Sequence, residues 1–178
     1  MRWFTSDTHF NHTNAIEYDK RPYKDIVEME ECLIRNWNMC VSKKDIVYHL
    51  GDFAFGNPKR WKRITDRLQG TINLIRGNHD IQNGATLKRL CVEGVPIFND
   101  VGDIDFTTIG MENIVMSHYP YCDSRFAKYA PVNIGDWLIH GHTHAKEKVN
   151  SRQINVSCTA WDYFPVSEVQ ILKIIKGD

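Results

Sequence analysis

The feature that most constrains the fold is a series of short predicted strands, each followed within three residues by a side chain able to bind a metal ion. The runs at residues 2–6, 46–50 and 71–75 are followed by Asp7, Asp52 and Asn78. Between the first two runs, residues 25–40 place apolar side chains at helical spacing, which predicts a helix. A strand, a helix and a strand in this order predict a βαβ unit, and therefore parallel strands whose ends meet at one edge of a sheet.

The rest of the chain changes character along its length. Asn57-Pro58 predicts the start of a second helix, in which Trp61, Ile64 and Leu68 share one face until Gly70. After about residue 101 the helical signal weakens, and strands are predicted at residues 104–109, 113–117, 137–140, 153–156 and 169–175. We therefore expect an α/β protein whose second half is rich in strands. Since no linker or repeat interrupts the sequence, we expect one domain over residues 1–178.

Composition narrows the classes of protein. The 178 residues are 42% hydrophobic, and 22 basic residues balance 22 acidic ones. A net charge of zero disfavours stable nucleic-acid binding, and no apolar stretch approaches the ~20 residues that cross a membrane. The start of the chain does not resemble a secretion signal, and its five cysteines contain no Cys-x-x-Cys pair, so we expect a cytoplasmic protein.

Residues with metal-ligand chemistry gather at the predicted strand ends. They are Asp7, His9, Asp52, Asn78, His79, His118, His142 and His144. Nitrogen and oxygen donors without thiolate suit Mn, Fe, Zn or Ni better than Ca or an iron–sulfur cluster. An extended backbone in Asp7-Thr8-His9 and in His142-Thr143-His144 would direct both side chains of each motif to the same side. These patterns predict a transition-metal site.

The joint order of these motifs resembles the calcineurin-like metallophosphoesterase superfamily, in particular its compact microbial and phage members. The matching blocks are Asp7-Thr8-His9, Gly51-Asp52, Gly77-Asn78-His79-Asp80, His118 and Gly141-His142-Thr143-His144. The resemblance implies a sandwich of two mixed β-sheets flanked by helices. It also implies two divalent transition metals, with Mn as first choice and Fe, Zn or Ni as alternatives. Asp7, His9, Asp52 and His144 would hold the first metal, and Asp52, Asn78, His118 and His142 the second, so that Asp52 bridges them.

Three further residues receive expected roles. His79, which is outside both ligand sets, would protonate the leaving oxygen. Arg76 would clamp phosphate oxygens with its planar guanidinium. Asp80 would either orient His79 or cap a following helix. The residues after Asp52 are Phe53-Ala54-Phe55-Gly56, where the protein phosphatases of the superfamily have Asp-Arg-Gly, so a protein phosphatase is disfavoured.

Simpler structural roles compete for several residues near the motifs. We expect His49 and His140 to be buried side chains, and leave open whether His12 contacts substrate. The basic residues around Trp61 fit a solvated helix face better than a nucleic-acid contact. Tyr119, Tyr121, Trp161, Tyr163 and Phe164 could stack on a base or simply pack.

The expected function is a binuclear metal-dependent hydrolase of phosphate esters. Two cations ~3.5–4 Å apart can neutralise both ends of a phosphoryl displacement. The favoured activity is that of a phosphodiesterase on a small nucleotide-like substrate, with no membrane partner. The alternatives are a metal-dependent nuclease, a phosphomonoesterase and, least favoured, a non-enzymatic metal-binding scaffold. The sequence leaves the oligomeric state open.

Overall fold

A computed structural model describes residues 1–80, 90–121, 123–126, 128–144 and 146–177. The first sheet has the strand order β12-β1-β2-β3-β6. Its strands are β1 (Arg2–Thr5), β2 (Ile46–His49), β3 (Thr71–Ile75), β6 (Asp100–Gly102) and β12 (Val166–Ser167). The four strands β1, β2, β3 and β6 are parallel, and β12 pairs with β1 in the antiparallel sense.

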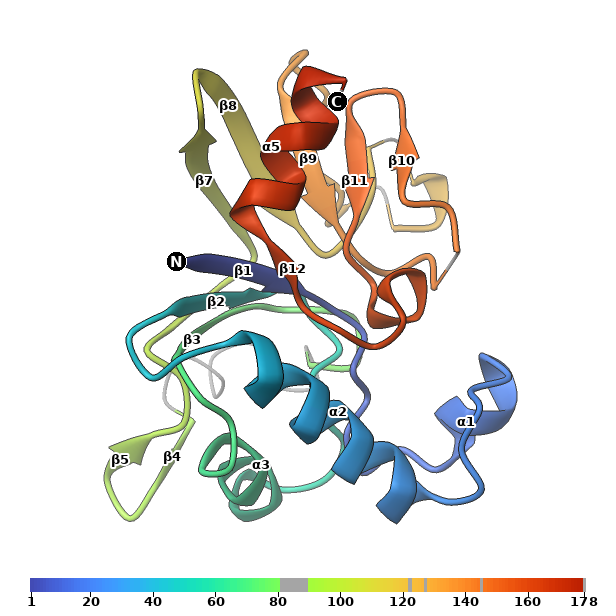
Figure 1. The fold of residues 1–178 in the computed structure, drawn as a ribbon, viewed down its shortest axis with the longest axis vertical. Helices are drawn as coiled ribbons and strands as arrows, with labels where there is room; N and C mark the ends of the chain where they lie inside the picture. Colours follow the sequence, from blue (N-terminus) through green and yellow to red (C-terminus); the bar gives the residue numbers. More distant parts are fainter. Residues whose placement is uncertain (81–89, 122, 127, 145, 178) are drawn as a thin grey trace.

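Helices connect the parallel strands as the βαβ pattern predicts. The short helix α1 (Asn14–Tyr18) and the long helix α2 (Ile26–Cys40) lie between β1 and β2, and α3 (Pro58–Thr65) lies between β2 and β3. Asp25 caps α2 by accepting a hydrogen bond from the Glu28 backbone N–H. Figure 1 shows α2 and α3 together on one face of the first sheet.

The second sheet has the order β10-β11-β9-β8-β7. Its strands are β7 (Ile104–Ile109), β8 (Glu112–Ser117), β9 (Trp137–His140), β10 (Val149–Asn150) and β11 (Gln153–Asn155). Its pairing is mixed, because β8, β9 and β11 are parallel while β7 and β10 form antiparallel edges. The remaining described elements are β4 (Cys91–Val92), β5 (Val95–Pro96) and two 3₁₀ turns, η2 (Ser124–Phe126) and η3 (Cys158–Trp161).

Two apolar layers hold these elements together. One lies between the sheets and contains Phe4 and Ile75 from the first sheet and Met116 and Ile139 from the second. The other lies between the first sheet and helices α2 and α3. Trp61, Ile64 and Leu68 are buried there, as their shared helix face predicts. The predicted sandwich of two mixed sheets flanked by helices is therefore confirmed (Figure 1).

The strand predicted at residues 169–175 is wrong. These residues belong to the helix α5 (Glu168–Lys176), which directly follows β12. Ser167 and Gln170 form a reciprocal capping box at its start, and Gly177 ends it with a left-handed φ of 77°. Ile171 is fully buried, and Ile174 and Ile175 follow at helical spacing. The local cap decided the structure, whereas the prediction considered only the apolar run. None of the described helices combines the length and hydropathy that crossing a bilayer requires.

Candidate metal centre

The metal-ligand residues of the sequence motifs lie on loops that directly follow strands. In the first sheet, Asp7 and His9 follow β1, Asp52 follows β2, and Asn78 follows β3. In the second sheet, His118 follows β8, and His142 and His144 follow β9. Because β1, β2 and β3 are parallel, and β8 and β9 are parallel, the loops of each sheet leave from one edge. The structure brings all seven side chains together there.

The backbone at these loops is not extended as predicted. Five of the seven residues have left-handed φ values: Asp7 (56°), His9 (50°), Asp52 (55°), His142 (69°) and His144 (49°). Such values are uncommon for residues with a Cβ, and they cluster at functional sites where surrounding contacts hold them. Each pair of ligands in the Asp-x-His and His-x-His motifs does face one site, but through two left-handed residues and not through a strand.

The first ligand set consists of Asp7, His9, Asp52 and His144, whose ligand atoms all lie within 4.8 Å of one another. His144 Nε2 lies 3.2 Å from Asp7 Oδ1 and 3.3 Å from His9 Nε2. His9 Nε2 is in turn 3.6 Å from Asp52 Oδ2. Three of the four residues are buried. This arrangement could hold one metal ion.

The second predicted ligand set converges beside the first. Asn78 Oδ1 is 3.1 Å from His118 Nε2 and 3.0 Å from His142 Nδ1. His118 Nε2 lies 3.7 Å from Asp52 Oδ2, the same oxygen that faces His9. The structure therefore places Asp52 Oδ2 between one imidazole of each set.

Burial and charge suit this cluster to a cation. Burial, together with the charges of Asp7 and Asp80, raises the pKa of Asp52 to about 9. Burial lowers the pKa of His9 to about 2 and that of His142 to about 4. His144 differs: burial lowers its pKa, but its hydrogen bonds to Asp19 and Asp7 outweigh burial and raise the pKa to about 10. Buried carboxylates next to the neutral imidazoles of His9 and His142 form a site that a divalent cation would stabilise. The donor set, which is nitrogen and oxygen throughout, fits the predicted transition metals.

Two glycines of the motifs permit this close approach. A Cβ at Gly51, whose φ is 91°, would lie 2.5 Å from His118 Nδ1 and from the backbone nitrogen of Gly77. A Cβ at Gly141 would lie 2.6 Å from Asp7 Oδ2. Both contacts are too short for real atoms, so these positions require glycine for the loops to meet.

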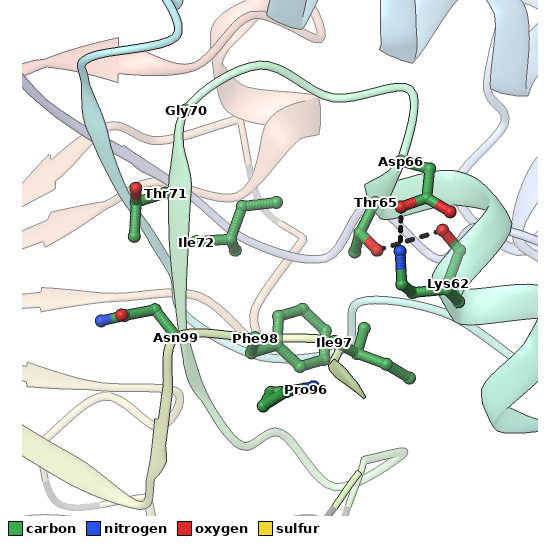
Figure 2. A pocket seen from close by; sticks show the side chains of 10 residues that line it. All are labelled: Lys62, Thr65, Asp66, Gly70, Thr71, Ile72, Pro96, Ile97, Phe98 and Asn99. Carbon is green, nitrogen blue, oxygen red and sulfur yellow. Dashed lines mark hydrogen bonds and ion pairs between the residues drawn. The ribbon is translucent and has the colours of Figure 1, made fainter. Parts of the chain in front are cut away.

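A pocket of ≈ 220 Å³ opens over the two ligand sets. Its lining includes ligands of both sets together with His12, Ala15, Tyr18, Asp19 and His79. A larger cavity of ≈ 410 Å³ lies elsewhere, between α3, the start of β3 and residues 96–99 (Figure 2). Its charged lining is the ion pair of Lys62 with Asp66, and its other walls are apolar, hydroxyl or amide side chains. Only the smaller of these two pockets contains metal-ligand chemistry.

Comparison with known proteins agrees with this geometry. The model of the calcineurin-like phosphoesterase superfamily domain matches residues 3–157. The chain belongs to the calcineurin-like phosphoesterase superfamily. It is therefore a phosphoesterase by family, and the family's metal dependence matches the Asp and His cluster.

Similar proteins extend over nearly the whole chain. An uncharacterized protein of Methanocaldococcus jannaschii is 34% identical, covering 98% of this chain and 90% of its own length. The gene 66 protein of Mycobacterium phage L5 is 30% identical, covering 89% and 86% respectively. A solved Aquifex aeolicus protein of unknown function has a TM-score of 0.73 at 28% identity, with 98% of both chains covered. A solved archaeal phosphodiesterase has a TM-score of 0.51 at 19% identity, covering 88% of this chain and 81% of its own, and shows likeness of fold alone.

His79 lies at the rim of the pocket over the two ligand sets. Its side chain is 39% exposed, and its Nε2 is 4.0 Å from Asp52 Oδ2. Its backbone N–H donates to Asp52 Oδ1 at 2.9 Å, which fixes the loop beneath the ring. The ring therefore faces both the ligand sets and the solvent-accessible pocket.

Asp80 supports the backbone of two ligand loops. Its buried carboxylate accepts hydrogen bonds from the backbone N–H groups of Asp52, Phe53 and Gly77 at 2.6–3.1 Å. These bonds tie the loop after β2 to the loop after β3. Orientation of the His79 ring by Asp80 stays a prediction. The expected cap of a following helix concerns residues 81–89, which lie outside the described residues.

Arg76 is not among the residues that line the described pocket. Its guanidinium forms a paired interaction with the Asp103 carboxylate, from Nε at 2.7 Å and from Nη2 at 2.5 Å. In this arrangement the donors expected to clamp phosphate bind a carboxylate of the chain itself. The phosphate role of Arg76 stays a prediction that would require this pair to open.

The remaining histidines and tyrosines divide between core and pocket. His49 and His140 are buried, as expected, and bond to Thr8 Oγ1 and to the Gly141 carbonyl. Tyr119 and Tyr121 are also buried, which favours packing over stacking on a base. His12 lines the pocket, and its ring stacks on Phe55 with centroids 3.8 Å apart.

Sequence reasoning missed Asp19 and Arg21. Asp19 lines the pocket and bonds to His144, while Arg21 bonds to Asp19 and to the Asp7 loop. Both residues follow α1 in a charged segment with no periodicity. Nothing local in that segment distinguishes a buried arginine from an ordinary surface one.

Proposed function

We propose that this protein is a binuclear metal-dependent phosphodiesterase that acts on a small, nucleotide-like substrate. The observation that carries the proposal is the position of Asp52 Oδ2, 3.6 Å from His9 Nε2 in one ligand set and 3.7 Å from His118 Nε2 in the other. A carboxylate shared in this way can bridge two ions. We propose that residues 1–178 form a single catalytic domain and that the protein acts in the cytoplasm.

The residues divide into two proposed metal sites. Asp7, His9, Asp52 and His144 would hold the first ion, and Asp52, Asn78, His118 and His142 the second. Two divalent cations, with Mn favoured over Fe, Zn and Ni, would neutralise charge on the phosphate ester and lower the pKa of water from ~15.7 toward ~7. The four described cysteines Cys32, Cys40, Cys91 and Cys158 are free thiols, consistent with a reducing compartment.

His79 is the proposed general acid. It belongs to neither ligand set, its ring reaches the pocket, and its backbone is anchored to Asp52. From the rim, its Nε2 could donate a proton to the leaving oxygen of a phosphate ester. Such proton transfer contributes about 10²–10⁴ in rate.

The aromatic side chains at the pocket rim favour a substrate with one planar group. Tyr18 lines the pocket and is 73% exposed, and His12 and Phe55 form a stacked pair beside His79. Stacking of a base on an aromatic side chain contributes ~1–3 kcal/mol, enough for one nucleoside but not for a long strand. The solved archaeal protein of similar fold is a phosphodiesterase, which supports the choice of a diester as substrate here.

A comparison of substrates tests the proposal. The Mn-loaded protein would be assayed for kcat/KM on bis-p-nitrophenyl phosphate, a cyclic nucleotide, p-nitrophenyl phosphate and a single-stranded oligonucleotide, each at several salt concentrations. We expect the two small diesters to exceed the monoester and the oligonucleotide. If kcat/KM is tenfold higher for the oligonucleotide than for the small diesters, and if oligonucleotide binding falls steeply with salt, the protein is a nuclease. If kcat/KM is highest for the monoester, the protein is a phosphatase.

A variant of the rim separates substrate stacking from general effects. Tyr18→Ala should raise KM for the cyclic nucleotide about tenfold, the equivalent of ~1.4 kcal/mol of lost stacking, and leave kcat nearly unchanged. Phe106→Ala is the matched control, because Phe106 is 67% exposed on the edge strand β7. Equal KM values for both variants would contradict recognition by the rim.

A further inference from the structure

A buried ion pair lies behind the first ligand set. The Arg21 guanidinium binds one oxygen of Asp19 twice, from Nε to Oδ2 at 2.9 Å and from Nη2 to Oδ2 at 2.7 Å. The Arg21 side chain is fully buried and that of Asp19 is 10% exposed. A buried charge pair of this kind costs desolvation energy, which is offset only when further hydrogen bonds satisfy both groups. Apart from a contact of Arg21 Nη1 with Met29 Sδ in the core, the further side-chain bonds of this pair within the described part of the chain lead to the loops of the metal centre.

Arg21 holds the loop that carries Asp7 and His9. Its Nη2 donates to the carbonyl oxygen of Asp7 and its Nη1 to that of Thr8, each at 2.9 Å. These carbonyls belong to the segment in which Asp7 and His9 adopt left-handed φ values of 56° and 50°. Such a conformation persists only when surrounding groups hold it. Arg21 supplies two of these restraints from one rigid, planar group.

Asp19 holds a ligand from the other sheet. Its second oxygen, Oδ1, lies 2.8 Å from Nδ1 of His144. In the neutral ring that would bind a metal, a hydrogen bond from Nδ1–H to a carboxylate leaves the lone pair on Nε2, which faces Asp7 Oδ1 at 3.2 Å. A carboxylate partner of this kind orients an imidazole ligand and raises its basicity.

We propose that Asp19 and Arg21 are positioning residues for the first metal site, with Asp19 setting the orientation of the His144 ring and Arg21 fixing the Asp7–His9 loop. This inference rests on the proposed function, since it requires a metal at the first ligand set. The side chains of Asn78, His118 and His142 bond to one another, and no hydrogen bond to Asp19 or Arg21 is found for them among the described residues, although the His142 backbone N–H donates to Asp7. The pair therefore supports one of the two sites selectively.

Cobalt titration of the metal-free protein tests this selectivity. Binding of Co²⁺ alone would be followed by calorimetry and by visible absorption in the wild type, in Asp19→Asn and in Glu31→Gln. The last variant is the control, because Glu31 forms an exposed pair with both Nη atoms of Arg67. We expect Asp19→Asn to weaken one of two binding events by about 10- to 100-fold and to alter its absorption spectrum. The second event, and both events of the control, should match the wild type.

The outcomes separate this inference from the proposed function. If the wild type binds no cobalt, the proposed function fails and the inference falls with it. If the wild type binds two ions and Asp19→Asn keeps both affinities and the spectrum, only the inference is overturned. Equal weakening of both events would also overturn it, because the pair would then support folding in general. Should Asp19→Asn not fold, Arg21→Lys decides: weakening of one event supports the inference, and two unchanged affinities overturn it.

Discussion

The two sheets contribute different chemistry to the metal centre. Loops of the first sheet carry every oxygen donor of the predicted ligand sets, namely Asp7, Asp52 and Asn78, together with His9. Loops of the second sheet carry three imidazoles: His118, His142 and His144. The negative charge of the site therefore comes from the loops of the first sheet, and the neutral donors come mostly from those of the second.

The loops of the two sheets also differ in how they are held. In the first sheet, the Asp80 carboxylate after β3 accepts hydrogen bonds from the backbone N–H groups of Asp52 and Phe53 after β2. These bonds hold the two loops together. In the second sheet, the backbone N–H of His142 donates to the carboxylate of Asp7, and the His144 ring bonds to Asp19. The imidazole loops thus depend on the carboxylate loops. Loss of Asp52, the first-sheet carboxylate that faces both ligand sets, should disturb both proposed metal sites, and loss of one imidazole of the second sheet should disturb one.

The strongest test of this difference is Asp52→Asn. Because one carboxylate oxygen faces both ligand sets, we expect metal content below two ions per chain. Activity should fall about a thousandfold or more, since every ~1.4 kcal/mol of lost transition-state stabilisation costs tenfold. Elemental analysis and kcat would be measured on the same preparation. Two tightly bound ions in this variant would rule out the bridging role of Asp52.

His142→Ala tests the second sheet. His142 is a predicted ligand of the second ion only, so this variant should keep one ion and lose the other. Activity should fall by about a hundredfold or more. Loss of a residue that merely orients a metal ligand costs about 10- to 100-fold, and His142 is itself a predicted ligand. Titration with Mn²⁺ would count the sites. Retention of both ions, or loss of both, would contradict the assignment of His142 to one site.

His79→Ala should have an effect of another kind, which is confined to catalysis and leaves metal binding intact. A general acid outside the ligand sets acts on chemistry, so the variant should keep both ions while kcat falls by about 10²–10⁴ for an alkyl ester. Esters with good leaving groups, such as p-nitrophenol, need little protonation and should lose much less. The ratio of the two losses is the measurement, and equal losses would show that His79 does not protonate the leaving group.

The sequence predicts the parallel half of the fold better than the remainder. The strands predicted before Asp7, Asp52 and Asn78 are present as β1, β2 and β3, because short strands that end in polar loop residues leave a local pattern in the sequence. The helix α5 was predicted as a strand, since its apolar residues form a short dense run. There the capping box of Ser167 and Gln170 was the deciding local signal.

The sequence predicted that the ligand residues would lie together, but it did not predict which residues hold them in place. Ligand types such as Asp7 and His144 can be recognised from their motifs. The partners Asp19 and Arg21 follow a short helix and contact residues 125 and 14 positions away in sequence. The pairing of Arg76 with Asp103, which lies 27 positions away, was likewise not predictable from the sequence. Long-range hydrogen bonds leave no local pattern, so the sequence predicts the donors of a site more readily than what orients them.

The smallest expected effect concerns a tie between the sheets. Arg2 on β1 donates to Thr107 Oγ1 on β7 at 2.5 Å and to both oxygens of Glu168 on α5 at 2.5 and 2.9 Å. The hydrogen bond and charge of Arg2 outweigh burial and hold the pKa of Glu168 below its ordinary value. A carboxylate with a lowered folded-state pKa stabilises the fold above its unfolded pKa of ~4.3, and this contribution disappears as the pH falls through the folded pKa.

Glu168→Gln should therefore lower the free energy of unfolding at pH 7 by about 0.5–1 kcal/mol, the usual range for a partly exposed ion pair. The difference from the wild type should shrink below about pH 4, because the wild-type carboxyl is then protonated too. Urea unfolding at pH 7, 5 and 3.5 would measure it. Glu31→Gln is the matched control, since the Glu31–Arg67 pair is more exposed and should contribute less. Metal content and kcat should not change in Glu168→Gln, because this tie joins the sheets through Thr107 and α5 and includes no residue of either ligand set. A loss of metal in Glu168→Gln would show instead that the spacing of the two sheets at this tie is transmitted to the ligand loops.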